Sequence, residues 1–153
     1  MKLFPWQKKK EFFTPEETQQ LVRAIQEAEL NTSGEVRIYV ESRCRYVDAI
    51  DRAQQIFFNL EMHKTDQRNA TLVYVAVKDK QVAVFGDEGI HAKVGETYWE
   101  NILRKMLLQF KQQKLVDGIC LAVHALGEAL QSYFPYKSDT DKNELPDEIV
   151  FGR

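Results

Sequence analysis

The residues best suited to chemistry surround one short acidic segment, Gly86-Asp87-Glu88-Gly89, which directly follows a buried apolar run. Two carboxylates supply oxygen ligands, and the flanking glycines let backbone carbonyls approach closely. Hard cations such as Ca²⁺ and Mg²⁺ bind oxygen ligands of this kind. The other reading is a solvated turn, because acidic residues are common in loops. The neighbours of the segment therefore decide its meaning.

Those neighbours follow from the order of the predicted helices and strands. Apolar residues at helical spacing predict four helices, at 12–30, 46–62, 95–110 and 117–133. Alternating or continuous apolar runs predict three strands, at 35–41, 70–77 and 81–86. The order α-β-α-β-β-α-α predicts an α/β fold, a three-layer α/β/α sandwich with a small mixed sheet.

Strand direction then predicts which loops meet. A helix joins the first two strands, so they should run parallel, whereas the short turn Lys78-Asp79-Lys80 returns the third strand antiparallel. The carboxyl end of the third strand therefore lies beside the amino ends of the other two. Residues 32–35, 61–70 and 86–96 should share this edge of the sheet.

We expect the functional site at this edge. The predicted ligands of a divalent cation, calcium in the first place with Mg²⁺ as the alternative, are the carboxylates Glu35, Asp66, Asp87 and Glu88.

An anion such as a phosphate ester would bind next to the cation. Its predicted ligands are Arg68, Asn69 and the helix N-terminus at Gly95. The catalytic candidates are Asp87, Arg68 and His91, with Asp87 or His91 moving protons. The sequence has no GxxxxGK[ST], GxSxG or HExxH motif, so any catalysis should be assisted by a metal or a carboxylate.

Composition and charge restrict the class of protein. With 153 residues, of which 44% are hydrophobic, the chain has material for one core. We predict an N-terminal arm at 1–11, one domain at 12–135 and a polar acidic tail at 136–153. A net charge of −2 argues against a nucleic-acid partner. No apolar run approaches the roughly 18 residues of a membrane span, and no signal peptide is evident, so we expect a cytoplasmic protein.

Four segments taken in order resemble the TPM domain family of bacteria and plant plastids: "SGEVRIYVE", "RNATLVYVAVKDKQVAVFGDEGI", "VGETYWENILRKMLLQF" and "DGICLAVHALGEAL". The resemblance covers residues 12–135, and the tail segment "NELPDEI" is similar to that of short bacterial members. It implies an α/β/α sandwich, calcium binding as in some members, and acid-phosphatase activity as in a thylakoid relative.

The chain departs from the family pattern at three positions. Ala70 stands where glycine is usual after Asn69, Arg68 stands where many members have an acidic residue, and Gln113 stands where many have glycine. The change at Arg68 bears on metal binding by that loop, and the change at Gln113 concerns a turn at the far edge. Many members are also exported and anchored in a membrane, and this sequence contains neither kind of segment.

Three functions follow. The first is a divalent-cation-binding domain of the TPM type. The second is a metal-assisted acid phosphatase acting on phosphomonoesters. The third is a non-catalytic module that binds a partner protein through the arm at 1–11 or the tail at 136–153.

Overall fold

The sheet of this protein has four strands in the order β3-β2-β1-β4. The structure is a computed structural model and describes residues 12–136 and 149–152. Its elements are, in chain order, α1 (Pro15–Glu29), β1 (Glu35–Glu41), α2 (Ala49–Asn59), β2 (Ala70–Ala76), β3 (Gln81–Gly86), α3 (Glu88–Val94), α4 (Glu96–Lys111), α5 (Leu115–Tyr133) and β4 (Ile149–Phe151).

The strand directions are those that the connections predict. β1 and β2 are parallel, with Glu35 beside Ala70, and β2 and β3 are antiparallel, with Thr71 beside Gly86. α1 begins with a reciprocal capping box, in which Thr14 accepts a hydrogen bond from the Glu17 N–H and the Glu17 carboxylate accepts one from the Thr14 N–H.

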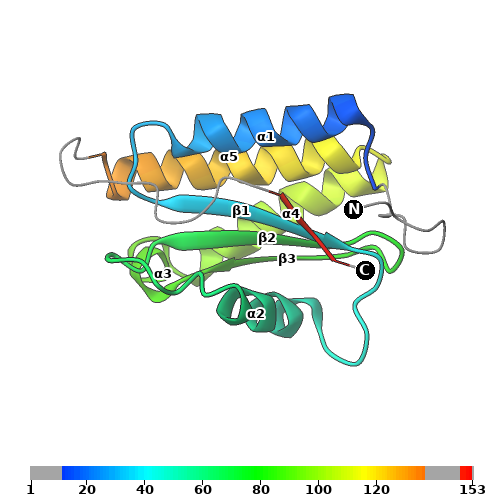
Figure 1. Cartoon of the computed structure of the whole chain (residues 1–153), viewed down its shortest axis with the longest axis horizontal. Helices are drawn as coiled ribbons and strands as arrows, with labels where there is room; N and C mark the ends of the chain where they lie inside the picture. The colour runs from blue at the N-terminus through cyan, green and yellow to red at the C-terminus, as the bar shows by residue number, and fades with distance from the viewer. Residues whose placement is uncertain (1–11, 137–148, 153) are drawn as a thin grey trace, which may run out of the picture.

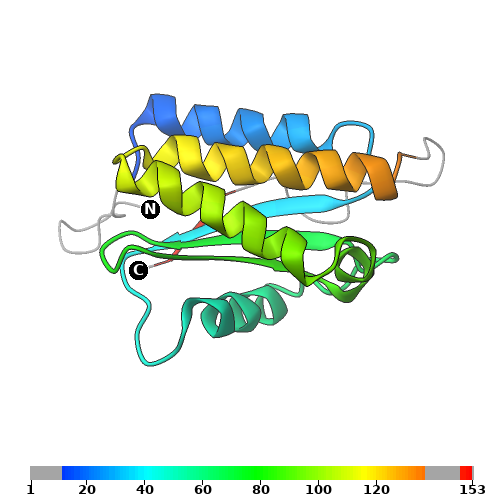
Figure 2. The ribbon, with the colours of Figure 1, turned by 180° about the vertical axis from the view of Figure 1, so that it is seen from behind.

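Helices cover both faces of the sheet, which confirms the three-layer architecture (Figure 1). α1, α4 and α5 lie on one side and α2 on the other, and the reverse view shows α4 crossing the sheet beside α5 (Figure 2). Two clusters of buried side chains result. One contains Val36, Val73 and Leu126 between the sheet and the three-helix layer, and the other contains Phe57 and Tyr74 beneath α2.

The structure adds two elements to the predicted order. The acidic segment at residues 86–89, expected as a turn, instead starts the short helix α3, whose N-cap is Asp87. The second addition comes from the predicted polar tail. Residues 149–151 form β4, which pairs in parallel with β1 and extends the sheet.

Two further predictions concern membranes and the chain ends. Within residues 12–136 and 149–152, no helix has the length and apolarity that crossing a bilayer requires. The predicted arm at 1–11 and most of the tail lie outside the described residues.

Candidate functional site

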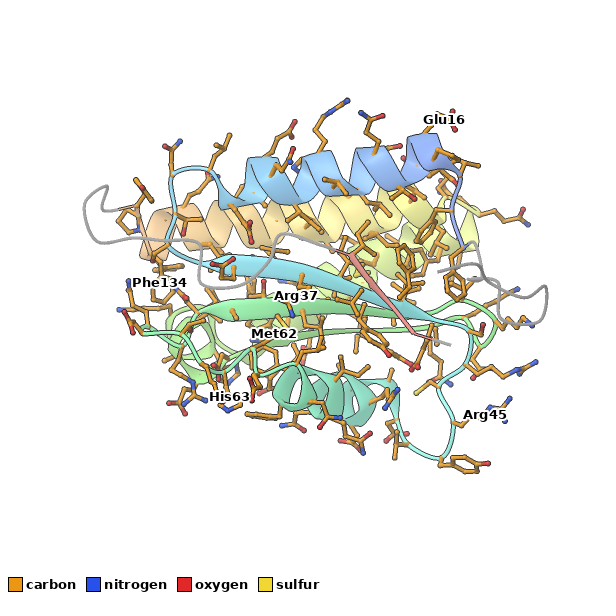
Figure 3. The ribbon with its side chains drawn as sticks, in the orientation of Figure 1. Glu16, Arg37, Arg45, Met62, His63 and Phe134 are labelled. Carbon is orange, nitrogen blue, oxygen red and sulfur yellow. The ribbon has the colours of Figure 1, made fainter. Side chains whose placement is uncertain are left out.

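The three segments predicted to share an edge meet at the amino ends of β1 and β2. β3 ends there, and the Asp87 N–H donates to the Ala70 carbonyl at 3.0 Å. Figure 3 shows His63 and Phe134 at this end of the molecule, whereas Arg45 lies at the opposite end. Residues from β1, β2, β3 and α3 therefore come together although up to about fifty positions separate them in the sequence.

Arg68 and Asp87 form the centre of this edge. The Arg68 Nε lies 2.6 Å from Asp87 Oδ2, and its Nη2 lies 2.9 Å from Oδ1. Its Nη1 lies 3.2 Å from the exposed carboxylate of Glu88. The hydrogen bonds to Asp87 raise the pKa of Arg68, so the guanidinium is a permanent cation. Arg68 thus joins two of the four predicted metal ligands.

Asp87 also organises the helix that follows it. Its carboxylate is buried, with 3% of the side chain exposed, and Oδ1 accepts a hydrogen bond from the Glu88 N–H at 2.8 Å. An acidic N-cap is favourable because the first N–H groups of a helix lack partners within the helix. Asp87 is therefore held from both sides, by a cation and by a helix start.

Gly89 lets α3 pack directly on the loop that carries Arg68. The Gly89 N–H donates to the Arg68 carbonyl at 2.9 Å. A Cβ at Gly89 would lie 2.0 Å from the Gln67 carbonyl oxygen and 2.6 Å from that of Arg68. The second glycine of the acidic segment thus has a packing reason that does not involve a ligand.

Asn69 is the buried amide of this edge, with 1% of its surface exposed. Its Nδ2 donates to the Ser33 hydroxyl at 3.2 Å, and Gln67 donates to the same hydroxyl at 3.1 Å. The Asn69 Oδ1 has no hydrogen-bond partner among the described residues. A buried acceptor without a partner is costly, and it marks a position that a cation or a water would satisfy.

His91 and Gly95 lie on the far side of α3. The exposed His91 accepts a hydrogen bond at Nδ1 from the Trp99 indole at 2.9 Å, and the two rings stack. Gly95 has φ of +78° and is the N-cap of α4, where it makes no side-chain cap. The helix start predicted at Gly95 is confirmed, and His91 is paired with an aromatic neighbour.

Glu35 and Asp66 complete the predicted ligand set. Glu35 is buried at the first position of β1, and its N–H donates to the Asn69 carbonyl, whereas Asp66 is exposed in the loop before β2. Within the described part of the chain, no three side chains of His, Cys, Asp or Glu are grouped closely enough to hold a metal. The edge therefore has ligands of the right chemistry but no preformed cage, and the calcium site stays a prediction.

The opposite edge holds a charged cluster that the sequence reasoning did not single out. Arg52 binds both oxygens of the buried Glu41, through Nε at 2.9 Å and Nη2 at 3.0 Å, and the Tyr74 hydroxyl donates to the same carboxylate. The hydrogen bonds that Arg52 donates to Glu41 raise the pKa of Arg52. A signal was present in the sequence, because an acidic residue that ends a buried strand needs a cation or a donor nearby.

Comparison with known proteins agrees with this fold. The protein-family model of the TPM domain matches residues 7–129 of this sequence. The NMR structure of the BA42 protein from the psychrophilic bacterium Bizionia argentinensis is similar, with 42% identity, a TM-score of 0.85, and coverage of 95% of this chain and 99% of that one. The solution structure of the N-terminal domain of the cg2496 protein from Corynebacterium glutamicum is 11% identical, with a TM-score of 0.65 over 88% of this chain and 84% of that one, and shares the fold.

None of the curated proteins matches the chain significantly. The family is nevertheless clear, because the matching model spans more than half of the sequence and a solved relative is 42% identical over nearly its whole length. The chain belongs to the TPM domain family.

Proposed function

We propose that the protein binds a divalent cation, calcium in the first place, at the edge formed by residues 32–35, 61–70 and 86–96. The observation that carries the proposal is the Oδ1 atom of Asn69, a buried acceptor with no hydrogen-bond partner among the described residues. This oxygen lies at the edge to which Asp87 and Glu88 also belong, and amide and carboxylate oxygens are the ligand types that a hard cation takes.

The positive charge of Arg68 should weaken the binding of a cation at this edge. Its guanidinium is already paired with both Asp87 and Glu88, and a calcium ion sharing either carboxylate would meet a positive charge a few ångströms away. The Arg68 side chain is 35% exposed, so it has room to turn toward solvent when a cation arrives. We therefore expect weak binding, which is strengthened when the charge at Arg68 is removed.

A calcium titration tests this proposal, followed by backbone ¹H–¹⁵N shifts in the wild type and in Arg68→Gln. We expect shifts in residues 65–70 and 86–96, with affinity at least about tenfold higher in Arg68→Gln, because a like charge at this range is worth about 1.4 kcal/mol or more. Calcium should also raise the melting temperature of the variant more than that of the wild type.

Arg104→Gln is the matched control, because it removes one positive charge from an exposed position on α4. Its calcium affinity should equal that of the wild type. A magnesium titration compares the smaller ion, which demands a near-octahedral set of ligands. Unchanged spectra at millimolar calcium in both the wild type and Arg68→Gln would refute the proposal.

The two other functions stay predictions, and the contacts at this edge favour neither. All three guanidinium nitrogens of Arg68 already face carboxylates, and His91 Nδ1 accepts from Trp99, so an incoming phosphate ester would have to displace existing bonds. Turnover of an aryl phosphate that Asp87→Asn abolishes would support the phosphatase. The arm and most of the tail invoked for a protein partner lie outside the described residues.

A further inference from the structure

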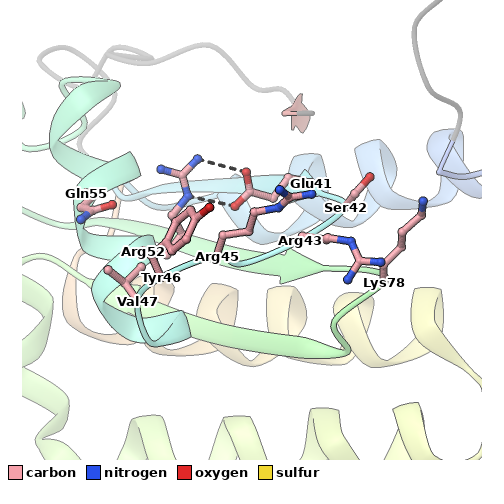
Figure 4. A pocket seen from close by; sticks show the side chains of 9 residues that line it. All are labelled: Glu41, Ser42, Arg43, Arg45, Tyr46, Val47, Arg52, Gln55 and Lys78. Carbon is pink, nitrogen blue, oxygen red and sulfur yellow. Dashed lines mark hydrogen bonds and ion pairs between the residues drawn. The ribbon is translucent and has the colours of Figure 1, made fainter.

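A second concave site lies at the opposite edge of the sheet, where β1 ends. It is a pocket of about 710 Å³, a size typical of small-molecule sites. The loop at residues 42–47 forms one side, Arg52 and Gln55 of α2 form another, and Lys78 of the β2–β3 turn completes it (Figure 4). None of the residues predicted for the calcium site lines this pocket.

The charge of the lining is strongly positive. The lining contains three arginines and one lysine but only one carboxylate, that of Glu41. Glu41 is buried and already held by the fork of Arg52, as the dashed lines in Figure 4 show. One cation and one anion therefore cancel within the wall, and the charges of Arg43, Arg45 and Lys78 remain.

These three cations differ in how far they are neutralised. Arg43 pairs with Asp79 through Nη1 at 3.0 Å. Arg45 and Lys78 are exposed, and neither has an ion pair with any residue in the described part of the chain. The pocket therefore presents about two uncompensated positive charges, although the whole protein carries a net charge of −2.

The loop that carries the arginines is held in place by its backbone. Between the exposed Arg43 and Arg45, the buried Cys44 donates its N–H to Asp79 Oδ2 at 2.7 Å and its thiol to the Val47 carbonyl at 3.3 Å. The Lys78 N–H donates to the Ser42 carbonyl at 2.8 Å, which fixes the turn beside the loop. Cations on a preorganised backbone lose less entropy when they bind a ligand.

We propose that this pocket binds a small organic dianion, whose head group is a phosphate monoester or a dicarboxylate. Arg45 and Lys78 neutralise the two charges of the ligand. Arg43 adds the N–H donors that it does not use for Asp79, because a guanidinium fork suits both phosphate and carboxylate oxygens. The pocket is larger than the head group alone requires. Tyr46, which is 96% exposed, and Val47 provide apolar surface for the organic part.

The test compares ligands that share a benzene ring and differ in charge. Phenyl phosphate and phthalate are dianions at pH 8, phenyl sulfate is a monoanion of similar shape, and phenol is neutral. Each is titrated into the full chain after metal has been removed with EDTA and the EDTA dialysed away, so the result is independent of calcium, and ¹H–¹⁵N shifts of residues 41–55 and 78 are followed. We expect at least one dianion to bind about tenfold or more tightly than phenyl sulfate, with phenol weaker still, and added salt to weaken binding.

Two double variants test whether the dianion binds at this pocket. Arg45→Gln with Lys78→Gln should lose dianion binding about tenfold or more, because each lost charged contact has an effect of this order. Arg104→Gln with Lys105→Gln removes the same charge from exposed positions on α4 and should bind like the wild type. The proposal is overturned if no dianion shifts these residues at millimolar concentration, if phenyl sulfate binds equally well, or if both double variants bind alike.

Discussion

Arg68 and Asp87 are joined by two parallel hydrogen bonds, at 2.6 and 2.9 Å, although nineteen positions separate them in the chain. The pair links the loop before β2 to the N-cap residue of α3, and Glu88 adds a third contact at 3.2 Å. A cation supplied by the protein thus occupies the acidic edge. The two residues of the pair differ in exposure: 35% of the Arg68 side chain is exposed, but only 3% of the Asp87 side chain.

That difference predicts unequal costs when either partner is removed. Arg68→Gln leaves a buried carboxylate without its cation and should lower the free energy of unfolding more than the change at Asp87 does, though less than the loss of a fully buried pair would, because Arg68 is partly exposed. Asp87→Asn keeps a good N-cap and leaves Arg68 to water and to Glu88, so it should cost about 1 kcal/mol. Urea unfolding at pH 7 measures both.

The double variant is the control for this pair. Because its glutamine and asparagine carry no buried charge, it should be less destabilised than the sum of the single changes. Additive costs would contradict an interaction between Arg68 and Asp87.

Gly89, inside the first turn of α3, and Gly95, at its C-terminal end, should lose stability for different reasons when each is replaced by alanine. Gly89→Ala would place a methyl group against two backbone carbonyls, at 2.0 and 2.6 Å, and should cost about 3 kcal/mol or more because the backbone must move. Gly95 has open space around its Cβ position but a φ of +78°. With ψ of 172°, this is a backbone conformation that glycine almost alone adopts, so Gly95→Ala should cost about 1–3 kcal/mol as backbone strain rather than as a clash. A Gly89→Ala variant as stable as the wild type would contradict the packing of α3 on residues 67 and 68.

Tyr74 predicts a loss of stability at alkaline pH. Burial, together with the hydrogen bond to Glu41, raises its pKa well above the ordinary value of 10.0. The unfolded chain releases this proton above pH ~10 and the folded chain keeps it, so folding is less favourable as the pH rises beyond that value. The stability advantage of the wild type over Tyr74→Phe should then shrink by at most about 1.4 kcal/mol per pH unit.

Tyr98 is a second, half-buried tyrosine for comparison. Burial raises its pKa to about 12, so its effect on stability has an upper pH limit. The stability advantage of the wild type over Tyr98→Phe should begin to shrink at pH ~10 and should stop shrinking once the pH passes the pKa of Tyr98 in the folded state. Denaturant unfolding between pH 8 and 12 measures the onset of this loss for both tyrosines. A difference between wild type and Tyr74→Phe that stays constant across this range would argue against a protected hydroxyl at Tyr74.

The last strand should contribute to stability through its aromatic side chain. The Phe151 ring packs on Phe12 and Phe13, with centroids 6.1 and 6.4 Å apart, and the Gly152 N–H donates to the Val40 carbonyl at 2.7 Å. Phe151→Ala should lower the free energy of unfolding by about 1–2 kcal/mol, less than for a core phenylalanine because the ring is only half-buried. Hydrogen exchange at Gly152 should accelerate in the variant, and unchanged protection would show that β4 pairs without this contact.

Much of this architecture could be predicted from the sequence, because the signals that specify it are local. Within residues 12–136 and 149–152, helical and strand periodicity predicts four of the five helices and three of the four strands, and connection lengths predict that β1 and β2 are parallel and β3 antiparallel. Those directions alone place Arg68 and Asp87 at one edge of the sheet.

The missed elements are the short ones. α3 has seven residues and β4 has three, too few for a periodic pattern to stand out. β4 also belongs to a polar segment and becomes a strand only because the edge of β1 offers it unpaired backbone groups.

The sequence by itself determined the layers, the strand directions and the edge that gathers the acidic residues, since each depends on neighbours in the chain. Only the tertiary structure decided that Arg68, rather than a second carboxylate, faces Asp87, and that Arg45 and Lys78 share a pocket with Arg52. These contacts join residues from separate elements, and a side chain's partner depends on which distant segment the fold brings within a few ångströms of it.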